Sequence, residues 1–194
     1  GRCKGYRTSI EFPQKEIPIH PYFLGVWLGD GLSASLRISN SETEILEFLD
    51  DYAEENGLVL MQHSHKEGLC QTYGLTTGKR GGIVINPLLN KVKELKLLNN
   101  KHIPDIYKIN SKEIRLQVLA GLIDTDGYLH ENCFEISTKS EKLKEDILYL
   151  SRSLGFGAYS ANKIVNGKKY YRIGIRGNVS LIPTRIKRKI GGPR

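Results

Sequence analysis

Two aspartates, each followed by a glycine, are the residues of this chain whose types and positions could do chemistry. Asp30 is the acid before the last glycine of FLGVWLGDG (23–31), and Asp126 has the same place in LAGLIDTDG (119–127). An Asp-Gly pair after a helix is most often only a helix end and a turn, but two pairs at matching places favour a site. Carboxylates brought side by side repel each other unless a cation lies between them. Such oxygen ligands suit Mg²⁺, which can assist phosphodiester hydrolysis.

The charge of the chain indicates its partner. Lysine and arginine number 29 and aspartate and glutamate 21, which leaves a net charge of +8. This balance favours a polyanion, DNA or RNA. No apolar run approaches the roughly 20 residues of a membrane span, so we expect no membrane association. The three cysteines lie far apart, without disulfide or zinc spacing, and they predict an intracellular protein of the nucleus, an organelle or a bacterial or archaeal cytoplasm.

The chain repeats itself, with the two Asp-Gly pairs at equivalent places. Further landmarks follow each pair in the same order and at a nearly constant offset. They are Ile38-Ser39 with Ile136-Ser137, Gly57 with Gly155, and Tyr73 with Tyr171. A duplicated unit explains this order better than chance. We expect an N-terminal extension at 1–16, a first repeat at 17–100, a linker at 101–110 and a second repeat at 111–190.

Each repeat has the same order of predicted elements. Helices are expected at 20–30, 41–56 and 87–98, and again at 111–126, 140–154 and 178–188. Strands are expected at 33–39, 58–65 and 71–77, and again at 133–139, 157–165 and 168–176. With a short extra strand at 128–130 the unit reads αββαββα. The predicted fold class is α+β, with two pseudo-symmetric units that each carry an antiparallel sheet.

The glycines of the two motif helices predict how the units pack. Gly25 and Gly29 are spaced i, i+4, as are Gly121 and Thr125, so each pair lies on one helix face. Small residues on facing surfaces let two helix backbones approach closely. We therefore expect the two helices to pack side by side, with both aspartates at the same end.

The motifs resemble those of a known family. LAGLIDTDG is similar to the signature of the LAGLIDADG homing endonucleases, and FLGVWLGDG resembles the degenerate first copy in their double-motif, monomeric members. The segments at 99–127 and 180–189 are similar to intein-borne members, and the resemblance extends from about 17 to 190. Because the chain begins Gly-Arg-Cys and ends Gly-Gly-Pro-Arg, the parts that splice proteins are missing, and we expect no self-splicing.

The resemblance implies roles for individual residues. Asp30 and Asp126 would be the catalytic carboxylates and would bind two or three divalent cations, Mg²⁺ foremost, together with the carbonyl groups of Gly29 and Thr125. Lys101, in Lys-x-Ile-Pro, would be the lysine of the first active centre. Lys189, with Lys187 as its rival, would be the second. Asp124 falls on a motif position that is usually structural, where the first copy has Leu28.

The strands predict a surface for reading DNA. Alternation puts apolar side chains on one face of each sheet and polar ones on the other, and a polar sheet face can enter the major groove, where arginine reads guanine. Two unlike halves imply a long asymmetric duplex site bound by one monomer, with no protein partner evident. The expected DNA-binding residues are Ser33, Ser35, Arg37, Ser39, Thr72, Thr76, Lys79, Arg80, Glu135, Ser137, Lys139, Lys163, Lys168, Tyr170, Arg172 and Arg176.

The function that follows is site-specific cleavage of both DNA strands by metal-dependent hydrolysis, with 3′ overhangs as in the family. Two alternatives stay open. One is a regulator that binds DNA without cutting it, and the other is an RNA maturase that assists the splicing of an intron.

Overall fold

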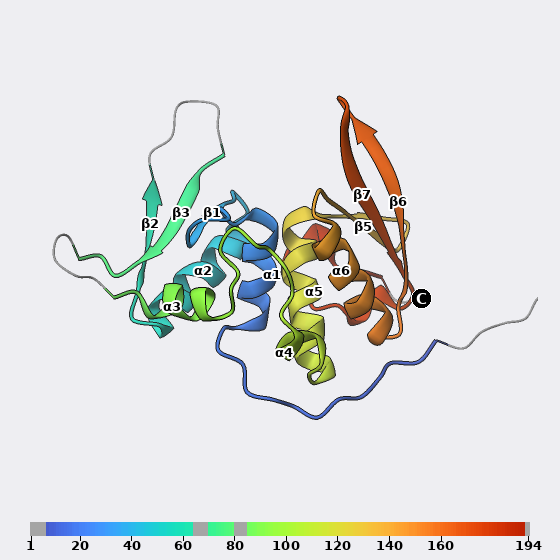
Figure 1. The fold of residues 1–194 in the computed structure, drawn as a ribbon, viewed down its shortest axis with the longest axis horizontal. Helices are drawn as coiled ribbons and strands as arrows, with labels where there is room; N and C mark the ends of the chain where they lie inside the picture. Colours follow the sequence, from blue (N-terminus) through green and yellow to red (C-terminus); the bar gives the residue numbers. More distant parts are fainter. Residues whose placement is uncertain (1–6, 64–69, 80–84, 193–194) are drawn as a thin grey trace, which may run out of the picture.

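The fold is built around two neighbouring helices. The computed structural model describes residues 7–63, 70–79 and 85–192. Helices α1 (Pro21–Asp30) and α5 (Lys112–Asp126) lie side by side at its centre, with one unit on either flank (Figure 1). The Ser111 side chain caps α5 by accepting from the backbone N–H of Ile114. Both helices end before a glycine with extended backbone, as the Asp-Gly pairs predict.

The first unit carries a three-stranded antiparallel sheet in the order β1-β3-β2. After α1 come β1 (Arg37–Ser39), α2 (Thr43–Glu55), β2 (Val59–His63), β3 (Thr72–Thr76) and α3 (Pro87–Glu94). The helices cover the inner face of the sheet, where Ile38 and Leu75 are buried. The end of the strand predicted at 58–65 lies outside the described residues.

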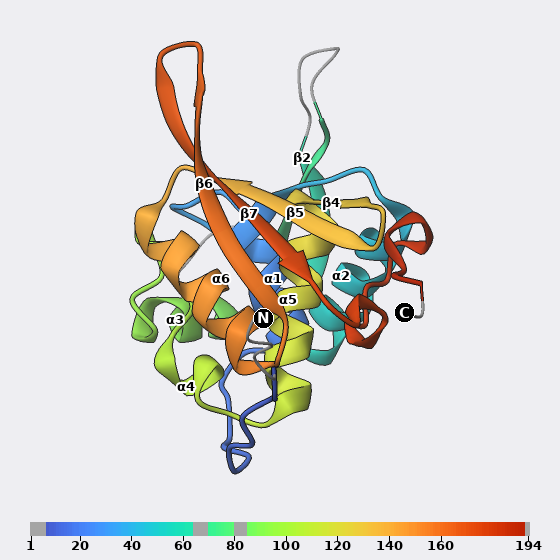
Figure 2. The ribbon, with the colours of Figure 1, turned by 90° about the vertical axis from the view of Figure 1, so that its right-hand side faces the viewer.

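The second unit carries a four-stranded antiparallel sheet in the order β4-β5-β7-β6 (Figure 2). After α5 come β4 (Gly127–His130), β5 (Cys133–Thr138), α6 (Glu141–Ser153), β6 (Gly157–Val165) and β7 (Lys168–Arg176). Asn166 and Gly167 both have positive φ, which makes the tight turn between β6 and β7. The predicted α+β class with antiparallel sheets is confirmed.

Several elements differ from the prediction. The helix expected at 178–188 is wrong: two 3₁₀ helices, η1 (Val179–Leu181) and η2 (Lys187–Lys189), replace it, because Pro183 cannot continue a helical hydrogen-bond ladder. The strand expected at 33–39 exists only as β1, since 33–36 form a turn. In the 101–110 linker a short helix, α4 (Asp105–Lys108), was not predicted.

The register of the sheets also corrects one landmark of the repeat. Ile38 pairs with Tyr73, whereas its equivalent Ile136 pairs with Ile173. Tyr73 therefore corresponds to Ile173, and the predicted match to Tyr171 is wrong by two residues. A shift of two keeps every side chain on its face of the sheet, so the assignment of outer and inner faces is unaffected.

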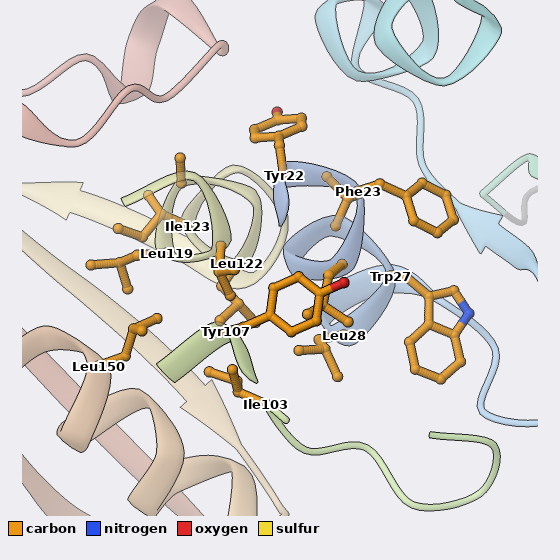
Figure 3. Packing of buried hydrophobic residues seen from close by; sticks show 14 of the residues in the cluster. Tyr22, Phe23, Trp27, Leu28, Ile103, Tyr107, Leu119, Leu122, Ile123 and Leu150 are labelled. Carbon is orange, nitrogen blue, oxygen red and sulfur yellow. The ribbon is translucent and has the colours of Figure 1, made fainter. Parts of the chain in front are cut away.

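The predicted contact between the motif helices is present and very close. A Cβ on Gly25 would lie 2.9 Å from Cα of Gly121 and would overlap the carbonyl oxygen of Val118. Around this contact Tyr22, Leu28, Leu122 and their neighbours form one continuous core, with Ile103 and Tyr107 of the linker packed against it (Figure 3). Within the described residues, no helix has the length and apolar character needed to cross a membrane.

The N-terminal extension runs along the side of the molecule opposite the sheet hairpins (Figure 1). The Ile10 N–H donates to the Ser153 carbonyl oxygen of α6 at 2.8 Å, and the Lys15 N–H donates to Asn110 at 2.9 Å. The chain then enters α1, so this segment connects the second unit to the first. Residues 1–6 of the predicted extension lie outside the described residues.

Candidate active site

The two aspartates lie together at one end of the central helix pair. Gly29 of α1 faces Thr125 of α5, and a Cβ on Gly29 would lie 3.5 Å from Oδ2 of Asp126 and would overlap the Thr125 side chain. Any larger residue at position 29 would therefore separate the helices just before their acids. The glycine that weakens α1 as a helix is what lets Asp30 and Asp126 come close.

The surroundings of the aspartates disfavour their charged forms. Partial burial, followed by the negative charge of Asp30, raises the pKa of Asp126 to about 6. Burial also raises the pKa of Asp30, against the hydrogen bond from Asn40. Asp126 still has an exposed surface, so solvent weakens both effects, but the two carboxylates still repel each other. A cation between the two groups would relieve that repulsion.

Asn40 is a site residue that the sequence analysis missed. Its Nδ2 donates to Oδ2 of Asp30 at 2.6 Å, while its Oδ1 accepts from the backbone N–H of Glu42 at 2.7 Å. Asn40 is only 6% exposed, and it follows β1 directly, so the sheet fixes its place. The equivalent position in the second unit is Thr138, whose hydroxyl accepts from the Ser140 N–H. The two acids are thus held differently.

Each predicted lysine lies at the end of its own motif helix. The Lys101 ammonium donates to the carbonyl oxygens of Leu28 at 2.9 Å and Gly29 at 3.1 Å. The last carbonyl groups of a helix have no partner within it, and a cation there also offsets the helix dipole. Lys101 therefore caps α1 while its charge acts on both aspartates.

Lys189 makes the equivalent contacts at α5. Its ammonium donates to the carbonyl oxygens of Ile123 at 2.9 Å, Asp124 at 2.7 Å and Thr125 at 3.3 Å. Lys189 is buried, whereas its rival Lys187 is exposed. Geometry thus favours Lys189 as the second lysine of the centre.

Asp124 holds chain segments together and does not face the other acids. Its carboxylate accepts from the Tyr22 hydroxyl at 2.7 Å and from the backbone N–H of Arg185 at 2.7 Å. It is 1% exposed. Leu28, at the equivalent place in α1, is buried in the core, so the first motif loses no hydrogen bond by lacking this acid.

A hollow of about 670 Å³ adjoins the acids and is lined by both units. Gly29 and Lys101 line it from the first unit and the linker, and Asp126, Thr138 and Lys139 line it from the second. Ser137 and Tyr170, which lie on the outer face of the second sheet, also line it.

The residues around the acids fit a divalent cation in part. Among the residues that the structure describes, no group of three or more His, Cys, Asp or Glu could hold a metal. Two carboxylates with a few other oxygens are, however, a usual arrangement for Mg²⁺, which keeps waters and takes phosphate ligands. The carbonyl oxygens of Gly29 and Thr125 already accept from the lysines, so a metal could use only their second lone pairs.

Comparisons with known proteins agree with this architecture. A family model described as homing endonuclease matches residues 102–181. The chain is 30% identical over 161 residues to the replicative DNA helicase DnaB of Mycobacterium intracellulare, with 82% of this chain covered. It is 29% identical over 175 residues to the homothallic switching endonuclease of Saccharomyces cerevisiae, with 76% covered. The chain spans 23% of the length of the first relative and 30% of the second.

The fold has a counterpart among solved structures. I-DmoI in complex with DNA and Mn superposes with a TM-score of 0.57 at 13% identity, over 80% of this chain and 88% of that one. Residues 102–181 are thus similar to the homing endonucleases, and the fold is similar to that of I-DmoI. The LAGLIDTDG segment of this chain lies within the residues that the family model matches.

Most of the side chains expected to bind DNA lie on the outer sheet faces. Gly74 of β3 pairs with Arg37, and Arg172 of β7 pairs with Ser137, so these residues share the outward faces of their sheets. The two hairpins extend beyond the central helices on the same side of the molecule (Figure 1). Apart from Ser33 and Ser35, the exposed or half-buried residues of the expected set are Arg37, Ser39, Thr76, Lys79, Glu135, Ser137, Lys139, Lys163, Lys168, Tyr170, Arg172 and Arg176.

Four residues of that set differ from the expectation or lie beyond the description. Thr72 is 3% exposed, and its hydroxyl shares a 2.8 Å hydrogen bond with Ser39, so it is not free to contact DNA. Ser33 and Ser35 lie in the turn before β1 and not on a strand; the Ser35 carbonyl oxygen accepts from the Trp27 indole. Arg80 lies outside the described residues.

The coupling of the acids predicts a pH dependence. The pKa of Asp126 in the folded protein is above its ordinary 3.8, so the folded state binds this proton more tightly than the unfolded state. The free energy of unfolding contributed by this group therefore falls as pH rises from about 4, and the loss is complete above about pH 6. Asp30→Asn should lower the pKa of Asp126, which ¹³C NMR titration of the metal-free protein measures. An unchanged pKa would contradict the coupling.

Proposed function

We propose that this chain is a site-specific DNA endonuclease that cuts both strands of a long asymmetric site by metal-dependent hydrolysis, leaves 3′ overhangs and acts as a monomer. The observation that carries the proposal is the meeting of the ends of α1 and α5, which places Asp30 beside Asp126. Two carboxylates placed to repel each other, on a protein of net charge +8, fit a metal and a phosphodiester better than any purely structural role.

The proposed roles follow from the positions of the side chains. Asp30 and Asp126 would hold Mg²⁺, which when bound supplies positive charge at the scissile phosphate and acidifies the attacking water. Asn40 would orient the Asp30 carboxylate. Lys101 and Lys189 would stabilise charge that develops on the phosphates, since an ammonium at a fixed place costs no reorganisation during the reaction.

The pseudo-twofold relation of the units suggests one active centre for each strand. Duplex DNA has a local dyad between its strands, and proteins with twofold symmetry match it. With the axis between α1 and α5 on that dyad, Lys101 would serve one scissile phosphate and Lys189 the other. Asp30, Asp126 and the metal that they hold would be shared between the two.

Base reading is proposed for the outer sheet faces. Arg37 is exposed on β1, and Arg172 on β7 forms an ion pair with Glu135 at 3.4 Å, with both side chains about half exposed. A single-contact ion pair this exposed to solvent contributes little to stability. The Arg172 side chain can therefore leave Glu135 and contact a DNA base. Arg172 and Glu135 then offer a donor for guanine and an acceptor for cytosine.

We expect Arg37→Ala and Arg172→Ala each to weaken binding to the specific duplex by about 1–3 kcal/mol, the usual worth of a bidentate contact to a base. Binding to random duplex should change far less. Fluorescence anisotropy with the two duplexes at one salt concentration measures both. Lys168→Ala, at the hairpin tip, is the matched control: it should weaken both duplexes alike, as loss of a phosphate contact does. Equal losses on both duplexes for the arginine variants would remove their assignment to bases.

Cleavage of a randomised duplex library with Mg²⁺, followed by sequencing of the cut ends, tests the whole proposal. Cuts at one long asymmetric site with staggered 3′ ends support it. Tight binding of duplex DNA without cuts would favour the non-cleaving regulator. Tighter binding of a structured intron RNA than of duplex DNA would favour the maturase. The retained acids of both motifs favour cleavage over either alternative.

A further inference from the structure

The segments that carry Lys101 and Lys189 are each bound by a carboxylate of the opposite unit. Lys101 lies in the linker, and its ammonium reaches the end of α1 in the first unit. Two residues later the Ile103 N–H donates to Oδ2 of Asp146 at 2.9 Å. Asp146 belongs to α6 of the second unit and is 6% exposed. The backbone beside this lysine is therefore held by the opposite unit.

Asp146 is held in turn by a second residue of the linker. Its Oδ1 accepts from the Lys108 ammonium at 2.6 Å, and Lys108 also pairs with Asp105 at 3.0 Å. Ile103 is fully buried beside Tyr107 and Leu150 (Figure 3). A buried N–H without an acceptor is costly, so the carboxylate fixes the path of the chain from Lys101 to α4.

The segment that carries Lys189 belongs to the second unit and is bound by residues of the first unit. Its neighbour Arg188 makes a two-pronged pair with Glu42, with both nitrogen–oxygen distances at 2.6 Å. Glu42 is the residue before α2 in the first unit. Arg185 adds to this attachment, since its guanidinium lies 4.7 Å from the ring centre of Tyr22 and 4.5 Å from that of Phe48. Both aromatic residues belong to the first unit.

Each unit thus holds the segment that carries the lysine of the other unit. The two residues that do so, Asp146 and Glu42, do not occupy equivalent positions of the repeat. Each lysine caps the motif helix of its own unit, while the opposite unit fixes the backbone that carries it. A long side chain such as lysine has several rotatable bonds, and its ammonium stays at one place only where its backbone is fixed. The helix contact alone would not supply this.

We propose that Asp146 and Glu42 are positioning residues, which hold Lys101 and Lys189 in place across the interface between the units. Each active centre then assembles only when both units are docked. The positioning of the lysines can be measured without DNA, while its consequence for cleavage rests on the proposed function.

Lysine acetylation followed by mass spectrometry measures the positioning directly. In Asp146→Leu the Ile103 N–H loses its acceptor, and we expect acetylation of Lys101 to speed up about five- to tenfold, the factor that one lost hydrogen bond represents. Lys189 in the same sample should not change. Asp146→Asn retains an acceptor and should protect Lys101, and Asp105→Asn, which removes the other partner of Lys108, is the matched control.

The ion pair between Glu42 and Arg188 can be tested by reversing the charges of its two residues. Glu42→Arg places two cations against each other, and we expect faster acetylation of Lys189 with Lys101 unchanged. The double variant Glu42→Arg with Arg188→Glu restores the pair in reverse, so Lys189 should again be protected. Equal exposure of both lysines in either single variant would indicate general loosening and overturn the proposal, as would no change in either.

The consequence for cleavage is a strand bias. On a plasmid that carries the site recovered from the library, Asp146→Leu should accumulate a nick in one strand and Glu42→Arg a nick in the other. Selective acetylation with no cleavage by the unchanged protein would refute the proposed function and leave the positioning intact. Suppose that Lys101→Met cuts one strand more slowly than the other, while Asp146→Leu and Glu42→Arg slow the cleavage of both strands equally. That result would refute the link between the positioning of the lysines and catalysis.

Discussion

Asp126→Asn is expected to lower the cleavage rate by at least about a thousandfold while leaving duplex affinity within a factor of a few. The amide keeps the size of the side chain but cannot supply the negative oxygen that a divalent cation needs. Loss of one well-placed electrostatic group in an active site costs about a hundred- to a thousandfold, and here the lost acid is shared by both strands. Single-turnover cleavage and anisotropy of the same preparation measure the two quantities.

Asp30→Asn should behave in the same way, although it also leaves Asn40 with an altered partner. If both variants keep their affinity for duplex DNA, the two carboxylates act in cleavage and not in recognition of the duplex. If either variant cut both strands at more than about a tenth of the wild-type rate, the two carboxylates would not be the metal ligands of the reaction.

Gly121→Ala is expected to lower the free energy of unfolding by about 1 kcal/mol. Alanine gains about 1 kcal/mol of helix propensity over glycine, which alone would stabilise α5. Its Cβ, however, would lie 2.7 Å from the Val26 nitrogen and would overlap the carbonyl oxygen of Tyr22. Both are backbone atoms, which cannot rotate away as a side chain would. The helices must separate, and overpacking of this kind costs about 1–3 kcal/mol. At the middle of that range the loss exceeds the gain by about 1 kcal/mol.

Urea unfolding followed by circular dichroism measures this effect, with Asp50→Ala at an exposed position of α2 as the control for helix propensity. Separation of the helices should also move Asp30 from Asp126, so the pKa of Asp126 should fall and cleavage should slow. A Gly121→Ala protein as stable as the wild type would show that the interface can adjust, and the close approach would then not explain the glycine.

Several features follow from local pattern and could be derived from the sequence. The motif helices, their ends at glycine and the hairpin at Asn166-Gly167 each depend on residues within a few positions of each other. The closeness of α1 and α5 could also be predicted, because the small residues recur on one face of each helix and duplication supplies the partner. Both acids and both lysines could be named for these reasons or from the family resemblance.

Other features arise only where distant segments meet. Asn40 gave no signal in the sequence, because an asparagine after a strand is ordinary until its amide is seen on Asp30. Thr72 alternates like an exposed residue, yet Ser39 of the neighbouring strand takes its hydroxyl. The loss of the predicted 178–188 helix follows partly from Pro183, but also from Asp124, which binds the N–H groups of Arg185 and Ile186 in place of helical carbonyls.

By itself the sequence determined the duplicated plan, the two acids and the glycine faces that bring them together, since these depend on short-range periodicity and on residue size. Only the folded chain shows that Lys189 and not Lys187 reaches the end of α5, that Asp146 binds the backbone near Lys101, and that Glu42 binds the neighbour of Lys189. The physical reason is that a hydrogen bond depends on position to within a fraction of an ångström. Partners 43 and 146 residues apart acquire that precision only when both units have packed.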